Sequence, residues 1–326
     1  MTRCPDFTHL LVLPHLRVQN ANAISSPLTH GFPAMTAFTG LMWALERRAR
    51  ADGLDFTFKA VGAVCHDHQE QVSDGGYVKT FCLSRNPVGK DGKTAAIVEE
   101  GRIHLELSLV LAVQSERWQR EPEAQQADSA RIADLFSTMR VAGGTLLPSL
   151  PGYRPYLIDL TGTERDRQEV FRKARLRLLP GFTLVARDDL LDQRLTTLQV
   201  NNPGATRLDA WLSLSRINWH WQAMDDAEAE GKWLHDRDDL GWVVPIPVGY
   251  GALGELHPPG SVVNARSANT PFRFVESLYS VGEWISPHRL GSPQQMLWYA
   301  DSRTEDGLYR LRNDYRPVSH YETDFD

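Results

Sequence analysis

The stretch RIHLELSLVLAV, residues Arg102–Val113, alternates apolar and polar side chains over most of its length. The apolar members that share one face are Ile103, Leu105, Leu107, Leu109 and Leu111. A period of two predicts a β-strand with one buried face, because successive side chains of a strand point to opposite sides. That face needs a covering layer, and the flanking sequence supplies candidates for it.

Helices and further strands are predicted on both sides of this segment. Apolar positions at helical spacing predict helices over Ala34–Arg50 and Glu123–Arg140. The further predicted strands are His9–Leu16, Phe56–Cys65 and Val141–Leu147. Pro14 indicates a bulge or an edge position in the first of them. The connecting segments are a polar loop, Val18–Pro33, and a long excursion, Asp67–Glu100, with a hairpin arm at Tyr77–Leu83 and a tip at Asn86–Lys93.

The resulting order is βαββαβ, the ferredoxin-like pattern that RNA-recognition domains share. We therefore expect an α+β fold with a ferredoxin-like domain at residues 1–150 and an insertion at about 67–100. Residues 151–326 are expected to form a less regular α/β extension packed on that domain. The elements expected there are strands at Tyr156–Leu160 and Phe182–Ala186, helices at Glu164–Leu178, Leu190–Val200 and Arg207–Ile217, an exposed insertion at Trp219–Asp239, an edge segment at Trp242–Tyr250, and aromatic-rich segments at Phe272–Trp284 and Met296–Arg312.

Composition indicates a globular protein, with 42% hydrophobic and 23% charged residues among 326. The net charge of −6 is unusual for a protein that binds nucleic acid alone. Charge is segregated, however: Arg165–Arg187 is mostly basic and Asp225–Asp239 mostly acidic. Three cysteines without a CxxC pair, no signal peptide and no apolar run of about 20 residues favour a reduced, cytoplasmic chain outside membranes.

Four local motifs have both a chemical and a structural interpretation. Gly143-Gly144, after Arg140, could let the backbone approach a phosphate or cap a helix. The loop Asn86–Gly92 lacks the first glycine of a P-loop, since Pro87 stands there. Cys65, His66 and His68 could hold a metal but do not complete a site, so a structural role is favoured. Arg172, Arg175 and Arg177 could track a nucleic-acid backbone, and tryptophans and tyrosines could stack on bases or pack in the core.

Several longer runs resemble one family. They are LRVQNANAISSPLT (Leu16–Thr29), GFP (Gly31–Pro33), AFTG (Ala37–Gly40), RNP (Arg85–Pro87), TAAIVEEGR (Thr94–Arg102), RVAGG (Arg140–Gly144), RLLPGF (Arg177–Phe182), GWVVPIP (Gly241–Pro247) and PFRFVE (Pro271–Glu276). Together they are similar to the second Csy subunit, of Cas-five type, of the type I-F CRISPR surveillance complex. Sequence near Trp118–Gln126 and Trp219–Asp236 departs from that family, so no contacts are inferred there.

The resemblance implies a repeat-associated RNA-binding fold whose β-hairpin thumb would fall within Asp67–Glu100. It implies binding of the guide RNA (crRNA) 5′ handle, as a heterodimer with the large Csy subunit and next to the backbone Csy subunit. Target DNA would be met through the assembled complex, and phage anti-CRISPR proteins are further possible partners. No catalytic residue, cofactor or metal is implied. The candidate RNA-binding residues are Gln19, Asn20, Asn22, Ser25, Ser26, Arg85, Asn86, Arg102, Arg140, Gly143, Gly144, Arg175 and Arg177.

Two other functions remain open at this point. A metal-independent ribonuclease of the same fold class would need a general acid and base, for which His15, His30, His66 or His68 could serve. A scaffold that contacts only proteins would need neither these histidines nor the RNA-binding residues.

Overall fold

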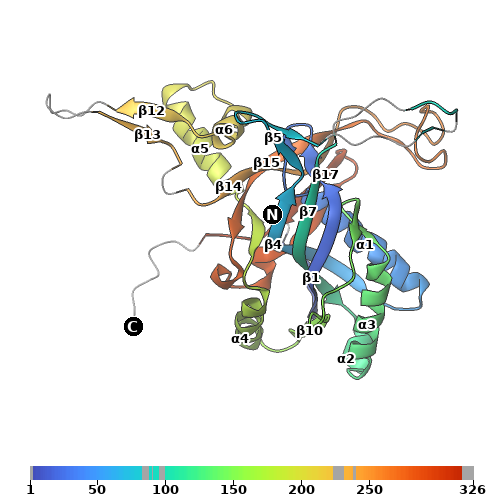
Figure 1. Ribbon diagram of the computed structural model, residues 1–326. Helices are drawn as coiled ribbons and strands as arrows, with labels where there is room; N and C mark the ends of the chain where they lie inside the picture. Colours follow the sequence, from blue (N-terminus) through green and yellow to red (C-terminus); the bar gives the residue numbers. More distant parts are fainter. Residues whose placement is uncertain are drawn as a thin grey trace, which may run out of the picture.

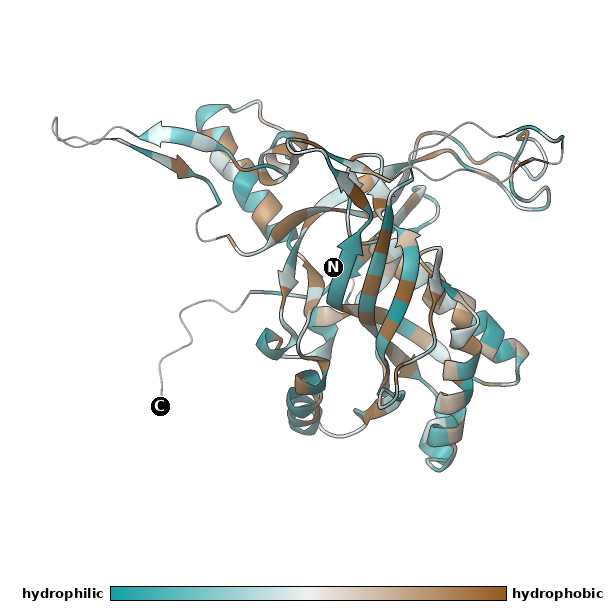
Figure 2. Ribbon diagram, in the orientation of Figure 1, coloured by the Kyte–Doolittle hydropathy of each residue, from teal (hydrophilic) through white to brown (hydrophobic). Residues whose placement is uncertain are grey.

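The computed structural model describes residues 3–82, 88–89, 91–94, 100–222, 231–237 and 240–317. Three long antiparallel strands form the middle of a large sheet: β1 (His9–Asn22), β4 (Thr57–Glu70) and β7 (Arg102–Gln114). β7 lies between the other two, and apolar and polar residues alternate along the strands in Figure 2. The predicted strand at Arg102–Val113 is confirmed.

Strand β1 corrects two predictions. It runs on to Asn22, so the segment that starts at Val18 is not all loop; pairing with β7 outweighs the low strand propensity of its amides. It is not an edge strand either, because β9 (Gly144–Leu146) and β10 (Tyr156–Asp159) pair with its other side. The bulge alternative for Pro14 is confirmed: the register shifts between Leu13 and Leu16.

Helices α1 (Met35–Ala51) and α3 (Ala124–Ser137) cover one face of these strands (Figure 1). Their buried side chains meet the apolar alternation of β1 and β7, and the shared cluster includes Phe38, Leu45, Ile132, Phe136, Leu13 and Leu107. An unpredicted short helix, α2 (Glu116–Arg120), precedes α3. The side chain of Ser115 accepts a hydrogen bond from the backbone N–H of Trp118, whose indole is buried.

The opposite face is covered only along part of its length. Helix α4 (Glu164–Ala174) and the 3-10 turn η1 (Arg175–Leu178) pack there through Phe171, Ala174 and Leu178. The predicted helix at Glu164–Leu178 therefore changes to a tighter turn at Arg175. Its start is fixed by a capping box between Thr163 and Asp166. The sheet residues under this layer reach no further than Val12, Val64 and Val110.

The sheet continues into the second half of the chain, in the order β11-β15-β14-β17-β16-β4-β7-β1-β9-β8. The additional strands are β8 (Arg140–Val141), β11 (Phe182–Ala186), β14 (Val243–Ala252), β15 (Val275–Ile285), β16 (Trp298–Arg303) and β17 (Leu308–Asn313). The short turns η2 (Pro287–Arg289) and η3 (Pro293–Met296) join β15 to β16. β14 pairs with β15 along its length but with β17 only at Gly249, Tyr250 and Gly251. The expected edge at 242–250 is therefore wrong for the end of the strand, whereas Val243–Pro247, where the prolines stand, pairs on one side only among the described strands.

The molecule is therefore a mixed α/β protein built on one large antiparallel sheet. Strands from residues 1–150 and from residues 151–326, the two predicted segments, pair with one another in this single sheet. Their division into two domains stays a prediction.

Smaller elements surround the sheet. Helices α5 (Asp188–Asn201) and α6 (Arg207–Leu214) pack on β14 and β15 through Leu191, Trp211 and Val281. Three two-stranded hairpins complete the described structure: β2 (Ile24–Ser26) with β3 (Thr29–His30), β5 (Val72–Asp74) with β6 (Lys79–Phe81), and β12 (Trp219–Gln222) with β13 (Lys232–His235). Within the described ranges no helix is long and apolar enough to cross a membrane.

Candidate nucleic-acid interface

Beyond the end of α4, the face of the sheet that no helix covers carries mainly polar side chains. Arg17, Gln19, His68, His104 and Glu106 line a shallow groove of about 230 Å³ there. On β7 these are the even-numbered positions, opposite Ile103 and Leu105 of the core. Alternation along the strand therefore places hydrogen-bonding groups on an open face and apolar groups beneath α1 and α3.

A second bulge in β1, at Asn20, brings a backbone N–H to the side chain of His104 in this groove. Asn20 has φ of 56°, and the register of β1 against β7 shifts between Val18 and Ala21. The Asn20 N–H donates to Nδ1 of His104 at 3.1 Å, so Nδ1 carries no proton. Neutral His104 then holds its proton on Nε2, which has no protein partner within the described part of the chain. The groove can thus offer a donor from His104 and the amide of exposed Gln19.

A stack of three rings supports one end of the groove. His15 lies between His66 and Tyr153, with ring centroids 4.1 and 3.9 Å apart. His15 Nδ1 donates to Glu106 at 2.6 Å. His66 Nδ1 donates to the Pro180 carbonyl at 2.6 Å, and its Nε2 accepts from the Ser108 hydroxyl at 2.7 Å. Burial lowers the pKa of His66, and the neighbouring His15 adds to the effect.

These contacts bear on whether Cys65, His66 and His68 bind a metal or have a structural role. Both nitrogens of His66 form hydrogen bonds with protein groups. Burial of the Cys65 thiol, with a smaller contribution from the negative charge of Asp67, raises the pKa of Cys65 to about 12. Among the described side chains, no three or more His, Cys, Asp or Glu residues gather closely enough to hold a metal ion. His66 is a structural residue, while His68 is exposed and lines the groove.

An aromatic cleft of about 660 Å³ adjoins the groove, and Asp67 and His68 line both. Its floor is a chain of ring contacts: Phe182 to Trp242 at 5.7 Å, Trp242 to Trp284 at 6.3 Å, and Trp284 to Phe32 at 5.0 Å. Phe182 is 44% exposed and Trp242 54%, although large aromatic side chains are usually better covered. Ring faces open to solvent can stack on unpaired bases.

The candidate residues of the segment Gln19–Ser26 divide into two groups. Gln19 and Asn20 are exposed at the groove, as described above. Asn22 instead closes a local turn, donating to the Ile24 carbonyl at 2.7 Å and accepting from the Ile24 N–H at 3.2 Å. The hydroxyls of Ser25 and Ser26 both contact Thr29 Oγ1, at 2.8 and 2.6 Å. Asn22 and Ser26 therefore stabilise the local conformation of the segment, whereas Ser25 also lines the aromatic cleft.

The Gly143-Gly144 pair belongs to a β-hairpin rather than a helix cap, because α3 ends at Ser137 and Arg140 already pairs in β8. Ala142 and Gly143 form the turn, and Gly144 begins β9. Gly143 has φ of 79° at the turn. A Cβ on Gly144 would lie 2.7 Å from the Ala21 nitrogen, so glycine allows the hairpin to seat against β1. Exposed Arg140 in β8 and Arg102, which pairs with Glu100, lie beside the end of β1.

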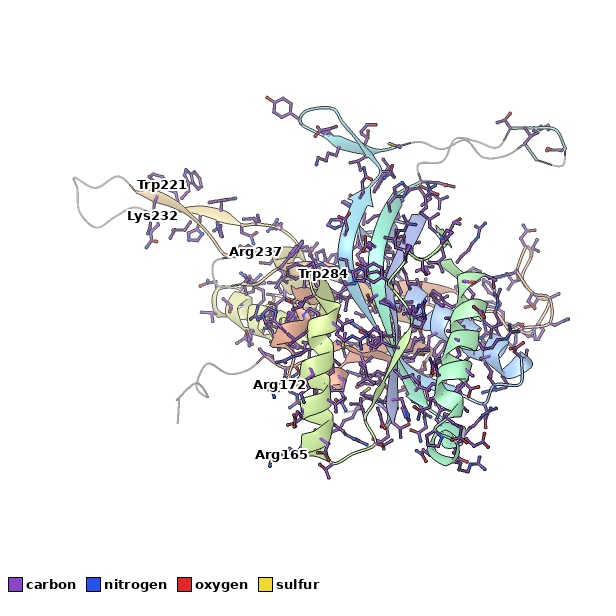
Figure 3. All side chains as sticks on the ribbon, turned by 60° about the horizontal axis from the view of Figure 1, so that its bottom comes forward. Arg165, Arg172, Trp221, Lys232, Arg237 and Trp284 are labelled. Atoms are coloured by element: carbon purple, nitrogen blue, oxygen red, sulfur yellow. The ribbon has the colours of Figure 1, made fainter. Side chains whose placement is uncertain are left out.

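Arg175 and Arg177 do not belong to this group. Arg175 donates to the Leu290 carbonyl, and Arg177 lies 3.5 Å above the ring of Tyr156. Tyr156 pairs with Val12, and Gln19 is roughly 20 Å further along β1 at about 3.3 Å per residue. Figure 3 shows the basic side chains Arg165 and Arg172 on α4, at the same far end. Arg85 and Asn86 lie outside the described residues.

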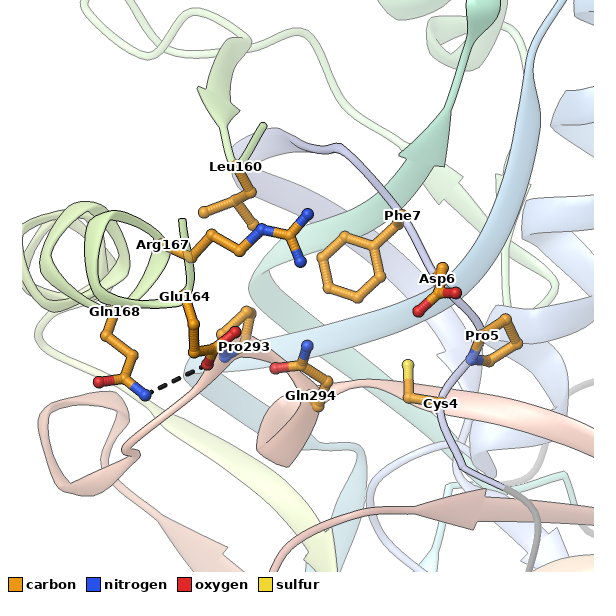
Figure 4. Close-up of a pocket in the computed structure, with 10 residues that line it drawn as sticks. All are labelled: Cys4, Pro5, Asp6, Phe7, Leu160, Glu164, Arg167, Gln168, Pro293 and Gln294. Atoms are coloured by element: carbon orange, nitrogen blue, oxygen red, sulfur yellow. Dashed lines mark hydrogen bonds between the residues drawn. The ribbon is translucent and has the colours of Figure 1, made fainter. Parts of the chain in front are cut away.

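The structure adds residues that the sequence interpretation did not select: Arg17, His104, Phe182, Trp242 and Trp284. The polar alternate positions of Arg102–Val113 could have indicated His104. Phe182 begins β11, Trp284 lies in β15 and Trp242 directly precedes β14, so only the sheet order brings them together. One further cavity, between Cys4, Phe7 and Arg167 (Figure 4), measures about 30 Å³ and has room for about one water.

Comparison with known proteins covers nearly the whole chain. Residues 11–311 match the family described as CRISPR-associated protein (Cas_Csy2). The chain is also 47% identical over 311 residues to the CRISPR-associated protein Csy2 of Pseudomonas aeruginosa (strain UCBPP-PA14). That alignment covers 92% of this chain and 94% of the relative. The groove and the aromatic cleft both fall inside the matched range.

Proposed function

The chain belongs to the Csy2 family of CRISPR-associated proteins, and from this premise we propose that it is a non-catalytic, guide-binding subunit of a type I-F surveillance complex. It binds the 5′ handle of the guide RNA as a heterodimer with the large Csy subunit. In the assembled complex it supports recognition of double-stranded target DNA, which is read by base pairing with the guide. The backbone Csy subunit is its further neighbour.

The observation that carries the RNA-binding proposal is the polar groove continuous with an aromatic cleft. Single-stranded RNA is recognised through exposed base edges, 2′-hydroxyls and stacking on aromatic rings. The groove offers amide and imidazole groups for the first two, and Phe182 and Trp242 offer open ring faces for the third. Arg17, Arg102 and Arg140 lie at or beside the groove and can meet phosphates.

The order of the central strands supports a ferredoxin-like core. β4, β7, β1 and β9 are neighbours in that order, each antiparallel to the next, and α1 and α3 cover one face. This is the order that two interleaved βαβ units produce. The β5–β6 hairpin, with Tyr77 fully exposed at its turn, belongs to the proposed thumb, as does the Val88–Thr94 bridge beyond it.

Two of the four histidines named for the ribonuclease alternative, His15 and His66, are poorly placed to act as a general base, which supports a non-catalytic role. A general base needs a nitrogen that can reach the 2′-hydroxyl. His66 has none to offer, and His15 is held between two rings with Nδ1 on Glu106. Incubation with repeat RNA tests this directly: the account expects intact RNA, and cleavage lost in a His68→Ala variant would contradict it.

Co-purification tests the proposed function. The chain is expressed with the large Csy subunit and a guide RNA carrying either its native or a scrambled 5′ handle. We expect a stable ternary species with the native handle and loss of RNA with the scrambled one. Equal recovery of both RNAs, or elution of the chain alone, would overturn the proposal.

A further inference from the structure

Two prolines occupy the edge of β14 that faces away from β15, beside the aromatic cleft. The Trp284 N–H donates to the Trp242 carbonyl at 3.0 Å, so these opposed residues form a hydrogen-bonded pair of the antiparallel ladder. Such pairs alternate with non-hydrogen-bonded pairs along the two strands. Pro245 and Pro247 lie an odd number of positions beyond Trp242 in an unbroken register, so both are at non-hydrogen-bonded positions. The missing proline N–H therefore removes no hydrogen bond to β15.

The same alternation directs the carbonyl groups of these positions away from β15, the strand beside β14 in Figure 1. Val243, at an equivalent position, shows this direction, because its carbonyl accepts from Arg237 at 2.5 Å. Strand β17 joins this side of β14 only from Gly249 onward. Within the described ranges the carbonyls of Pro245 and Pro247 accept no hydrogen bond. This edge therefore offers acceptors and, since proline has no N–H, no donor.

The acceptor edge borders the open aromatic rings. Both prolines line the aromatic cleft, together with Phe182 and Trp242. Pro245 is partly exposed and Pro247 is buried, so the Pro245 carbonyl is the accessible acceptor of the two. The cleft volume of about 660 Å³ falls within the usual range of ligand pockets. An occupant that satisfies this site presents a flat ring to the indole of Trp242 and an N–H to the carbonyl.

The need for a donor separates the bases of a guide RNA. Adenine carries an amino group at N6 and cytosine one at N4. Guanine carries the acceptor O6 at the place of the adenine amino group, and uracil carries O4, as thymine does, at the place of the cytosine amino group. An acceptor that faces the Pro245 carbonyl leaves that carbonyl unpaired. The edge of β14 therefore favours adenine and cytosine over their oxo counterparts.

Charges along the cleft favour a nucleotide over a basic side chain from a partner protein. Lys79 lines the cleft and can meet a phosphate. The Glu70 carboxylate already accepts from His30 at 2.8 Å, and the Asp67 carboxylate accepts from the His68 backbone N–H at 2.9 Å. An entering lysine or arginine would meet the like charge of Lys79 and two carboxylates that already hold hydrogen bonds.

We propose that the aromatic cleft is a base-selective subsite that takes one adenine or cytosine of the guide 5′ handle. The base stacks on Trp242, and its amino group donates to the Pro245 carbonyl. Pro245 determines specificity through its backbone, because it supplies an acceptor and has no N–H to offer an oxo group. The inference rests on the proposed function and deepens it, since handle binding by itself requires no preference for an amino group.

Removal of single amino groups from the handle tests the inference on the assembled complex. Each handle adenosine is replaced in turn by purine riboside, and each cytidine by 2-pyrimidinone riboside, which lack only the amino group. We expect one position at which affinity falls about tenfold. The identity of that position shows whether the base is adenine or cytosine. Discrimination against a scrambled handle without a response at any position would overturn the subsite alone, whereas equal binding of native and scrambled handles would overturn the proposed function.

Two protein variants assign the response to the cleft. In Trp242→Ala the loss caused by removing the amino group should shrink to about twofold or less. Pro245→Ala adds an N–H to the edge, so discrimination against inosine or uridine at the responsive position should fall about fivefold. Pro258→Ala, in the exposed segment after β14, is the control and should leave both quantities unchanged. A response that persists at full size in both cleft variants would place the recognition on another subunit and overturn the inference.

Hydroxyl-radical footprinting distinguishes a protein occupant of the same cleft. Oxidation of Trp242 is measured by mass spectrometry in the chain with the other Csy proteins, before and after guide RNA is added. We expect protection of Trp242 only after the RNA is added. Protection by the protein subunits alone would show that a protein fills the cleft and would overturn the inference.

Discussion

At the scale of single residues, Trp242 combines strong exposure with contacts that hold its ring in place. Its indole touches Phe182 and Trp284, yet 54% of the residue remains exposed. If a guide base stacks there, Trp242→Ala should reduce handle affinity about tenfold, since one stacked base contributes about 1–3 kcal/mol. Trp242→Phe should retain most of the affinity. Filter binding of the assembled complex measures both, and equal affinities of all three proteins would contradict the role.

Protonation of His66 should destabilise the fold in mild acid. Its folded pKa is lowered, so the unfolded chain binds more protons as the pH falls below about 6.5. His9 has a pKa lowered by burial in the same direction. The free energy of unfolding should therefore fall between pH 7 and pH 5, by at most about 1.4 kcal/mol per pH unit for each histidine.

Urea unfolding at several pH values measures this slope. The His66→Gln variant should have a smaller slope of unfolding free energy against pH, because glutamine does not titrate. The control variant His220→Gln, at an exposed histidine, should have the same slope as the unchanged protein. An unchanged slope in the His66 variant would show that the ring stack does not titrate with folding.

At the scale of elements, the two adjacent glycines of the β8–β9 hairpin are required for different reasons: Gly144 for lack of space and Gly143 for its backbone conformation. Ala at 144 would press on Ala21 and Val18 and should destabilise the protein by about 2 kcal/mol. Ala at 143 meets no atom within 4 Å and is opposed only by its φ of 79°, which should cost about 1 kcal/mol. Chemical denaturation of Gly143→Ala and Gly144→Ala compares them, and a larger loss at 143 would contradict the seating of the hairpin.

Element order along the first 150 residues could be read from hydrophobic period, and each long strand and helix predicted there occurs. The short helix α2, the β2–β3 hairpin and the division of Val141–Leu147 between β8 and β9 were not predicted. Element ends could not. β1 continues through the polar run Gln19–Asn22 because β7 and β9 supply its hydrogen bonds, which local sequence does not reveal. The same limit applies to Trp242–Tyr250, where the pairing of Gly249 and Tyr250 with β17 could not be predicted because β17 comes later in the chain.

The predicted site residues overlap only in part with the groove, and their role in binding RNA stays a prediction. Gln19 lines the groove, the backbone N–H of Asn20 bonds to His104 in its wall, and Arg140 lies beside it. Asn22 and Ser26 have the right functional groups, but their partners Ile24 and Thr29 use them locally. Arg175 and Arg177 were selected by their charge and their expected place on one side of a helix, and the turn η1 places them at the far end of the sheet.

At the scale of the whole molecule, the salt dependence of handle binding follows the number of phosphates met near the groove and not the net charge of −6. Three arginines, Arg17, Arg102 and Arg140, lie near the groove. Contacts between these arginines and handle phosphates should contribute about −2 to the slope of the logarithm of the binding constant against the logarithm of the salt concentration. Arg140→Ala should reduce its magnitude by about 0.7. Arg165→Ala, on the distant α4, is the matched control and should leave the slope unchanged. A larger effect at Arg165 would move the RNA path to the basic helix.

The central claim is that this subunit itself holds the 5′ handle across the open end of β1, β4 and β7 and the adjoining aromatic cleft. The most direct test places a photoreactive 4-thiouridine in the handle of the assembled complex and maps the crosslinked peptides by mass spectrometry. The account predicts adducts within residues 17–20, 66–70 or 102–106, or at Trp242. Adducts confined to other subunits, or to α4 of this chain, would contradict it.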